Sequence, residues 1–175
     1  MPFNINQFKG AMNLDGARPN LFEVTIPVFN RKLVFTCKTA QLPGSTLGVV
    51  EVPYFGRMIK LAGNRTFTEW TVSVLNDEDF VVRNQIESWM ADINAHERNV
   101  AEKLYGLPGL GGYAFDSTVD QYGKQGNIIK SYNFVGMWPI DLSPIELSWD
   151  ANDQIEEYQV TFAYQYWTSR TSDVV

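Results

Sequence analysis

Residues 155–167 place a large apolar side chain at almost every second position, and this spacing constrains the fold more than any other feature of the chain. Successive side chains of a β-strand point to opposite faces of its sheet, so the spacing predicts one long strand with two different faces. The apolar face consists of Tyr158, Val160, Phe162, Tyr164 and Tyr166, and the small, uncharged face of Gln159, Thr161, Ala163 and Gln165. The apolar face must be buried, whereas the other face can meet water or another subunit.

Other alternating segments lie on either side of turn-forming residues and predict antiparallel strand pairs. The predicted pairs are 145–149 with 155–167, 57–61 with 66–75, 114–122 with 127–138, and 21–26 with a returning strand at 32–38. Pro139 is expected to end the third pair, because proline cannot donate a hydrogen bond to a ladder.

Four segments depart from this strand pattern. Residues 1–16 are predicted to form an N-terminal arm that orders against a partner. Residues 42–56 are predicted to form an extended contact loop, because glycine and proline interrupt a stretch that keeps many apolar residues. Residues 77–96 are the helix region, since apolar residues recur there at helical spacing after an acidic start. Residues 103–113 are rich in glycine and predict a loop.

Together these elements predict a mainly β fold, an antiparallel β-barrel or sandwich with one flanking α-helix. The 175 residues are expected to form a single domain (1–175), large enough to bury a core without disulfides. Hydrophobic residues make up 45% of the chain, which argues against disorder over its bulk.

Side chains that carry catalysis or bind metals are scarce. His96 is the only histidine and Cys37 the only cysteine, so we expect no catalytic residues, no metal site and no cofactor. Cys37 shares one face of an expected strand with Leu33 and Phe35, which predicts a buried, unreactive thiol. The absence of a secretory leader and of any apolar run near 20 residues indicates a protein made in a cytoplasm, with no membrane partner.

Four blocks, in order along most of the chain, resemble the tail tube protein family of T4-like contractile bacteriophages. They are residues 17–24 (ARPNLFEV), 37–43 (CKTAQLP), 57–77 with AGNRTF and WTVSV, and 136–167, from GMWP through WD to YW. The chain departs from the family pattern between about residues 94 and 113, where the glycine-rich stretch looks inserted or reworked.

The resemblance implies a structural virion protein that forms hexameric rings, which stack into the inner tube of a contractile tail assembled in the bacterial host cytoplasm. The implied partners are a tail sheath protein, a tape-measure protein, and baseplate and tail-terminator proteins, with transient passage of double-stranded DNA during ejection. A net charge of −6 suits such a conduit, because clustered Lys and Arg would hold the phosphate backbone.

Two sets of residues are predicted to serve this assembly. Exposed apolar side chains of the arm and the contact loop are suited to stacking one ring on the next. The ring-stacking candidates are Phe3, Ile5, Phe8, Leu47, Val49, Val50, Val52, Tyr54 and Phe55. The polar face of the long strand is expected to lie toward the lumen, with Gln159, Thr161 and Gln165 as lumen-face candidates.

Two other interpretations stay open on sequence grounds. The same tube could belong to a phage-derived contractile injection or secretion system. A protein of another class, a monomeric ligand-binding β-barrel, would line its cavity with the aromatic strand faces.

Overall fold

The computed structural model describes residues 16–29, 32–96 and 112–170, together with Ile5, Gly10 and Lys103. The predicted N-terminal arm and the glycine-rich loop at 103–113 lie almost entirely outside these residues. The described strands are β1 (Phe22–Thr25), β2 (Cys37–Ala40), β3 (Ser45–Tyr54), β4 (Arg57–Phe67), β5 (Trp70–Leu75), β6 (Phe115–Tyr122), β7 (Ile128–Leu142), β8 (Glu157–Ala163) and β9 (Tyr166–Arg170). The described helices are α2 (Lys32–Thr36) and α3 (Val81–Ile93).

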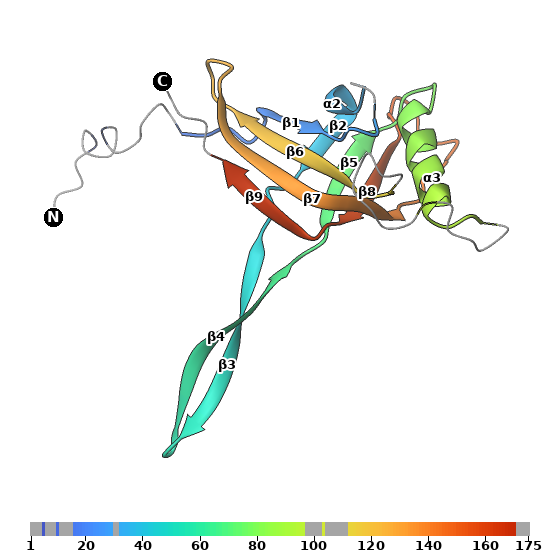
Figure 1. The fold of residues 1–175 in the computed structure, drawn as a ribbon. Coiled ribbons are helices and arrows are strands. Elements are labelled where there is room, and N and C mark those ends of the chain that lie inside the picture. Colours follow the sequence, from blue (N-terminus) through green and yellow to red (C-terminus); the bar gives the residue numbers. More distant parts are fainter. Residues whose placement is uncertain are drawn as a thin grey trace.

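The body of the molecule is one folded sheet in the order β1-β6-β7-β8-β5-β2, with β9 also paired to β7, while β3 and β4 form a separate hairpin (Figure 1). Every strand pair is antiparallel. The long strand β7 joins the two halves, because it pairs first with β6 and β9 and then with β8. The fold is therefore mainly β, as predicted, but it is not a closed barrel, since the end strands β1 and β2 do not pair with each other.

An aromatic cluster holds the two halves of the sheet together. The ring of Trp70 on β5 lies 4.6 Å from that of Phe134 on β7 and 5.9 Å from that of Phe162 on β8. Helix α3 covers the same core with Val82, Ile86 and Trp89. The α3 helix falls within the predicted region 77–96, and the carboxylate of Asp79 accepts the Val81 amide at its start, 3.2 Å away.

The prediction of one long strand over residues 155–167 is wrong, because residues 155–156 and 164–165 are not strand and the segment forms β8 and β9. Tyr158, Val160 and Phe162 are buried, and β8 and β9 continue in one register, from Trp138 opposite Ala163 to Phe134 opposite Trp167. The alternation shifts between β8 and β9, where β7 carries a positive φ at Gly136.

Because of this shift, Tyr164 and Trp167 rather than Tyr164 and Tyr166 share the apolar side. Both rings contact Phe67, with centroid distances of 6.1 and 6.4 Å. Tyr166 is 48% exposed, so its predicted place on the buried face is wrong.

Three predicted strand pairs are wrong. Residues 143–156 contain no strand, so the pair 145–149 with 155–167 does not form. Residues 32–36 form the helical turn α2, which contacts β1, β2 and β5 between the two ends of the sheet. Residues 62–65 continue the ladder instead of turning, so β4 pairs with β3, and β5 pairs with β2 and β8. For β5 the partner strand β8 lies far away in sequence, where local alternation cannot reveal it.

The predicted pair 114–122 with 127–138 is confirmed as β6 and β7. Its expected end at Pro139 is wrong, because β7 runs on to Leu142. Pairing with β6 stops at Met137, so from Trp138 onward β7 has β8 as its neighbour and an edge on its other side. A proline is tolerated on such an edge.

Cys37 opens β2 after α2, so the predicted strand face shared with Leu33 and Phe35 does not exist. Its thiol is half-buried and lies 3.7 Å from the carbonyl oxygen of Thr39. Burial raises the pKa of Cys37 from its ordinary value of 9.0 to about 12. The thiol is therefore held protonated at neutral pH, which agrees with the expectation of an unreactive cysteine.

We expect Cys37 in the folded protein to resist alkylation by iodoacetamide at pH 8. Thiolate is the reactive species, and the higher pKa lowers its fraction roughly a thousandfold relative to the unfolded chain. The protein is alkylated with and without denaturant, and mass spectrometry of quenched time points measures both rates. Equal rates in the two samples would contradict the prediction.

Candidate assembly surfaces

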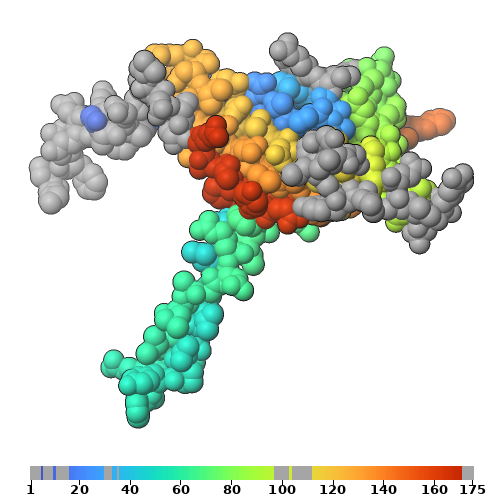
Figure 2. Space-filling view, viewed as in Figure 1, coloured from blue at the N-terminus to red at the C-terminus, as the bar shows by residue number. Residues whose placement is uncertain are grey.

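The hairpin of β3 and β4 projects far from the body as an isolated pair of strands (Figure 2). Every residue of β3 is exposed, and in β4 only Gly63 and Phe67 are partly covered. The sequence-based contact loop at 42–56 is thus wrong in its conformation, because most of it is strand. Its exposure and apolar character are as expected. A lone two-stranded hairpin is at best marginally stable in water, so this one calls for a partner.

The two faces of the hairpin differ in chemistry. Val50 pairs with Leu61 and Val52 with Ile59, so these four side chains form an apolar face, between 41% and 53% exposed. Tyr54 and Arg57 continue it toward the turn. The opposite face is mixed: Glu51 pairs with Lys60, and their charged groups lie 3.7 Å apart. The apolar face is the part of the hairpin that water favours least.

The hairpin turns at Phe55 and Gly56, both with positive φ (44° and 80°), as in a type I′ turn. Glycine adopts this backbone freely, but a phenylalanine there costs about 1–2 kcal/mol. The Phe55 side chain is also 91% exposed, and its ring packs edge-on against Tyr54 at 4.6 Å. An exposed aromatic residue in an unfavourable conformation indicates a function outside the isolated subunit.

Near the body, the two strands of the hairpin approach each other closely at Gly48 and Gly63. The register slips by one residue between Leu47 and Val49, at Gly48. A Cβ atom on Gly63 would come within 3.1 Å of the Gly48 backbone. A side chain at position 63 would therefore push the two strands apart by a few tenths of an ångström, so glycine suits this slip in the register.

The structure places the ring-stacking candidates unevenly. Leu47, Val49, Val50, Val52 and Tyr54 lie on β3 and Phe55 lies at the tip. Ile5 is 69% exposed, while Phe3 and Phe8 lie outside the described residues. The sequence analysis missed the β4 half of the apolar face, Ile59 and Leu61, because it pairs residues 57–61 with 66–75 and not with the contact loop.

A second surface is the polar outer face of the folded sheet. On β8, Gln159 is exposed and Thr161 is half-buried, with the Thr161 and Thr71 hydroxyl oxygens 3.2 Å apart. Gln165 is exposed between β8 and β9. The same face continues over the other half of the sheet through a row of residues in register: Thr25, Thr118, Asn133 and Thr168. The sequence analysis missed this row, because polar and apolar positions do not alternate cleanly in β7.

Comparison with known proteins shows which family the chain belongs to. A family described as phage tail tube protein matches residues 4–170. The chain belongs to the phage tail tube protein family. It is 36% identical over 154 residues to the tail tube protein gp19 of Enterobacteria phage T4, covering 87% of this chain and 91% of that protein. It is 27% identical over 170 residues to the tail tube protein of Serratia phage KSP90, covering 91% and 93%.

Solved structures of contractile machines share the fold of this tail tube protein. The anti-feeding prophage tube-terminating cap superimposes with a TM-score of 0.64 at 18% identity, over 90% of this chain and 92% of that one. The sheath–tube complex of an extracellular contractile injection system gives 0.60 at 16% identity, over 90% and 93%. Family membership makes the role of the chain structural, in the phage tail, and not enzymatic.

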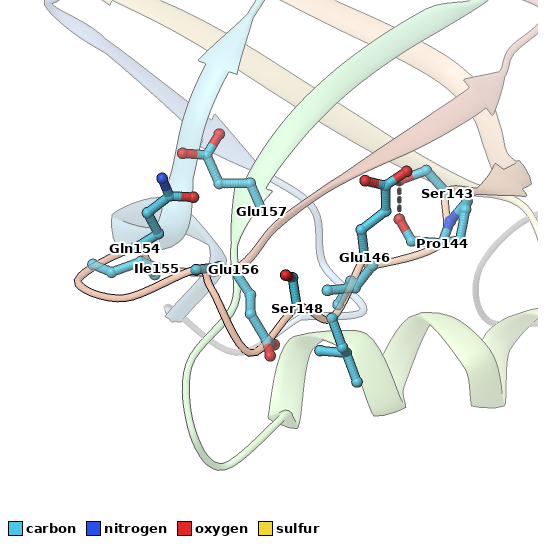
Figure 3. Close-up of a pocket in the computed structure, with 11 residues that line it drawn as sticks. Ser143, Pro144, Glu146, Ser148, Gln154, Ile155, Glu156 and Glu157 are labelled. Atoms are coloured by element: carbon cyan, nitrogen blue, oxygen red, sulfur yellow. Dashed lines mark hydrogen bonds between the residues drawn. The ribbon is translucent and has the colours of Figure 1, made fainter.

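The hollow along residues 143–157 does not gather its carboxylates into a chemical site. A cavity of about 750 Å³ lies along residues 143–157, beside α3 (Figure 3). Its carboxylates, Glu146, Glu156 and Glu157, spread along the loop instead of converging on one point. Asn76 holds Glu156 through a 2.7 Å side-chain hydrogen bond, and Lys38 pairs with Glu157.

Nothing else in the described ranges suggests a catalytic or metal centre. No group of three or more His, Cys, Asp or Glu side chains is placed to hold a metal ion in residues 16–29, 32–96 and 112–170. His96 is exposed and lines a small hollow with Ile93 and Pro139. Neither helix described is long and apolar enough to span a membrane.

The hairpin should contribute little to the stability of a tail tube subunit. Ile59→Ser, on the exposed apolar face, is expected to change the free energy of unfolding by less than about 0.5 kcal/mol, as surface substitutions do. Phe162→Ala, in the core beneath Trp70, should cost about 3–5 kcal/mol. Urea denaturation of unassembled subunits measures both. A loss above about 2 kcal/mol for Ile59→Ser would show that the hairpin supports the body.

Proposed function

We propose that this chain forms hexameric rings that stack into the inner tube of a contractile phage tail, assembled in the host cytoplasm, and that the tube conducts double-stranded DNA. The hairpin is the observation that carries ring stacking. Its apolar face leaves four large side chains half-exposed, and each would gain about 1 kcal/mol on burial against another subunit. No part of the described body covers that face.

The polar outer face of the sheet supports the conduit. The described strands of this face carry mostly threonine, serine, asparagine and glutamine, and one row of it holds Arg170 in register with Glu23, Asp120 and Ser131. A single cation beside two carboxylates is not the cluster that holds phosphates tightly. The chain is net −6, so passing DNA would be weakly repelled and would not bind. Gln159, Thr161 and Gln165 are the proposed lumen-face residues, together with Thr71 and Asn133.

The proposed partners are a sheath around the tube, a tape-measure protein inside it, and baseplate and terminator proteins at its ends. The solved relatives include a tube in complex with its sheath and a tube-terminating cap. Those assemblies belong to other machines, and they support the corresponding contacts here by likeness of fold. The identity to the T4 protein favours a phage tail over an injection or secretion system.

Removing the outer hairpin should abolish tubes while sparing subunits. Replacing residues 49–62 with Asn-Gly keeps the pair Leu47 opposite Arg65 and shortens both strands equally. Deleting β3 alone is a poorer test, because β4 would become an unpaired exposed edge. We expect a folded subunit with unchanged thermal stability that forms no tubes in negative-stain micrographs. Normal tubes from this variant would refute the role of the hairpin in stacking.

A labelling experiment tests the lumen face. A thiol introduced by Gln159→Cys should react in intact tubes with a small maleimide that enters the channel, but at least tenfold more slowly with a polymer-bearing maleimide. In unassembled subunits both reagents should react quickly, because the position is exposed. Leu147→Cys, at a site 80% exposed on the loop beside α3, serves as the matched control. Rapid polymer labelling at position 159 in intact tubes would place this face outside the channel.

A further inference from the structure

The described body contains an apolar hollow where the sheet fails to close. A cavity of about 240 Å³ is lined by Phe22 of β1, Ala40 of β2 and Val119 of β6, with Pro19, Leu42 and Gln121 around it. These residues come from both unpaired ends of the sheet, so the cavity occupies the seam where a closed barrel would have a β1–β2 ladder. We call it the seam cavity. No charged side chain lines it.

We propose that the seam cavity of one subunit receives the Phe55 side chain from the hairpin tip of a second copy. This contact deepens the proposed function and rests on it, because it names the surface on which the hairpin of a stacked subunit lands. Phe55 is the most exposed aromatic side chain of the hairpin, at 91%. The cavity offers it an uncharged lining that is apolar except for Gln121.

Size supports this occupant. A cavity of about 150 Å³ holds a benzene molecule, so 240 Å³ leaves room for a phenyl ring and part of its backbone. The conformation of the tip points the same way. Phe55 stands where Asn, Asp or Gly would fit the turn without strain, so its ring serves something that the isolated hairpin lacks.

Reach excludes the same subunit as the donor. Leu42, on the rim, precedes β3 by three residues, and the ten residues of β3 span roughly 33 Å. The tip therefore lies about one hairpin length from its own seam cavity. A contact between tip and seam joins two different patches, so it is head-to-tail and can repeat from copy to copy. Each copy would then be displaced from the last by about the length of the hairpin.

Charge supports a second copy as the source of this tip. Residues 45–67 contain Arg57, Lys60 and Arg65 against Glu51, so the hairpin is net +2 within a chain of net −6. The rest of the chain is correspondingly acidic, and it would attract the hairpin of another subunit. Arg57 adjoins Phe55 at the tip.

Phe55→Asn tests the anchor, because stability and assembly should move in opposite directions. Asn-Gly suits the turn, so the thermal stability of the subunit should stay the same or rise. The critical concentration for tube assembly, measured by sedimentation, should increase about tenfold or more, as expected for losing one buried aromatic side chain. Phe55→Leu retains most of the apolar area and should remain within about threefold of the wild-type value. Unchanged assembly by Phe55→Asn would overturn the anchor while leaving the tube intact.

Disulfide cross-linking between separately prepared variants tests the receiving cavity. Phe55→Cys subunits are mixed with Leu42→Cys subunits, so a cross-linked pair can only join two copies. We expect a dimer band after mild oxidation of assembled tubes, and none from Phe55→Cys mixed with His96→Cys, which tests the other small hollow. Cys37→Ser in both backgrounds removes the native thiol.

Three results would count against the seam cavity. Cross-linking of position 55 to position 96, or of a Phe8→Cys variant in place of Phe55→Cys to position 42, would assign a different receiving site or a different occupant. An absence of any cross-link in tubes that form normally would also overturn the contact. If wild-type protein forms neither rings nor tubes, the proposed function itself fails, and this contact fails with it.

Discussion

Two tryptophan side chains fix the root of the hairpin to the body, and the direction of the whole projection depends on them. Trp70 Nε1 donates to the carbonyl oxygen of Gln41 at 2.7 Å, and Trp167 Nε1 donates to that of Gly44 at 3.1 Å. Both indole rings also pack in the aromatic core, Trp70 on Phe134 and Trp167 on Tyr132. The Trp70 indole N–H is partly buried and needs an acceptor, which the chain entering β3 supplies. The core therefore orients a hairpin whose outer residues touch nothing in the described body.

The parts of the fold that the sequence predicts well are those whose burial follows a local period. Helix α3 and the buried run Tyr158, Val160 and Phe162 each lie against one continuous core, so their side-chain spacing reports the structure directly. The β6–β7 pair is predicted from the turn-forming residues 123–126 between its strands. The strand predicted at residues 32–38 is wrong over 32–36, because the alternation of five residues does not distinguish a helical turn from a strand. The turn α2 packs between β1 and β2.

The hairpin shows why part of the assembly surface could not be predicted. Its turn falls at Phe55–Gly56, which lacks the usual Asn-Gly or Asp-Gly signal, whereas Ala62-Gly63-Asn64 has turn-like composition but continues a strand. The sequence identified the apolar residues from 47 to 55 as contacts. It could not separate Val50 and Val52 from Val49, because the segment was predicted to be a loop, and the two faces exist only once β3 is a strand.

Charged and apolar side chains contribute differently to the proposed contact. The cationic hairpin and the acidic remainder attract over distances near the Debye length, about 8 Å at physiological salt, so charge can orient an approaching subunit. Ion pairs on an exposed surface add little net free energy, and the pair of Glu51 and Lys60 is already satisfied within the hairpin. Lasting adhesion must then come from burial of Val50, Val52, Ile59, Leu61 and Phe55, which salt does not screen. A tube held in this way would remain assembled at ionic strengths that remove its electrostatic guidance, because the apolar face is desolvated only in the assembled state.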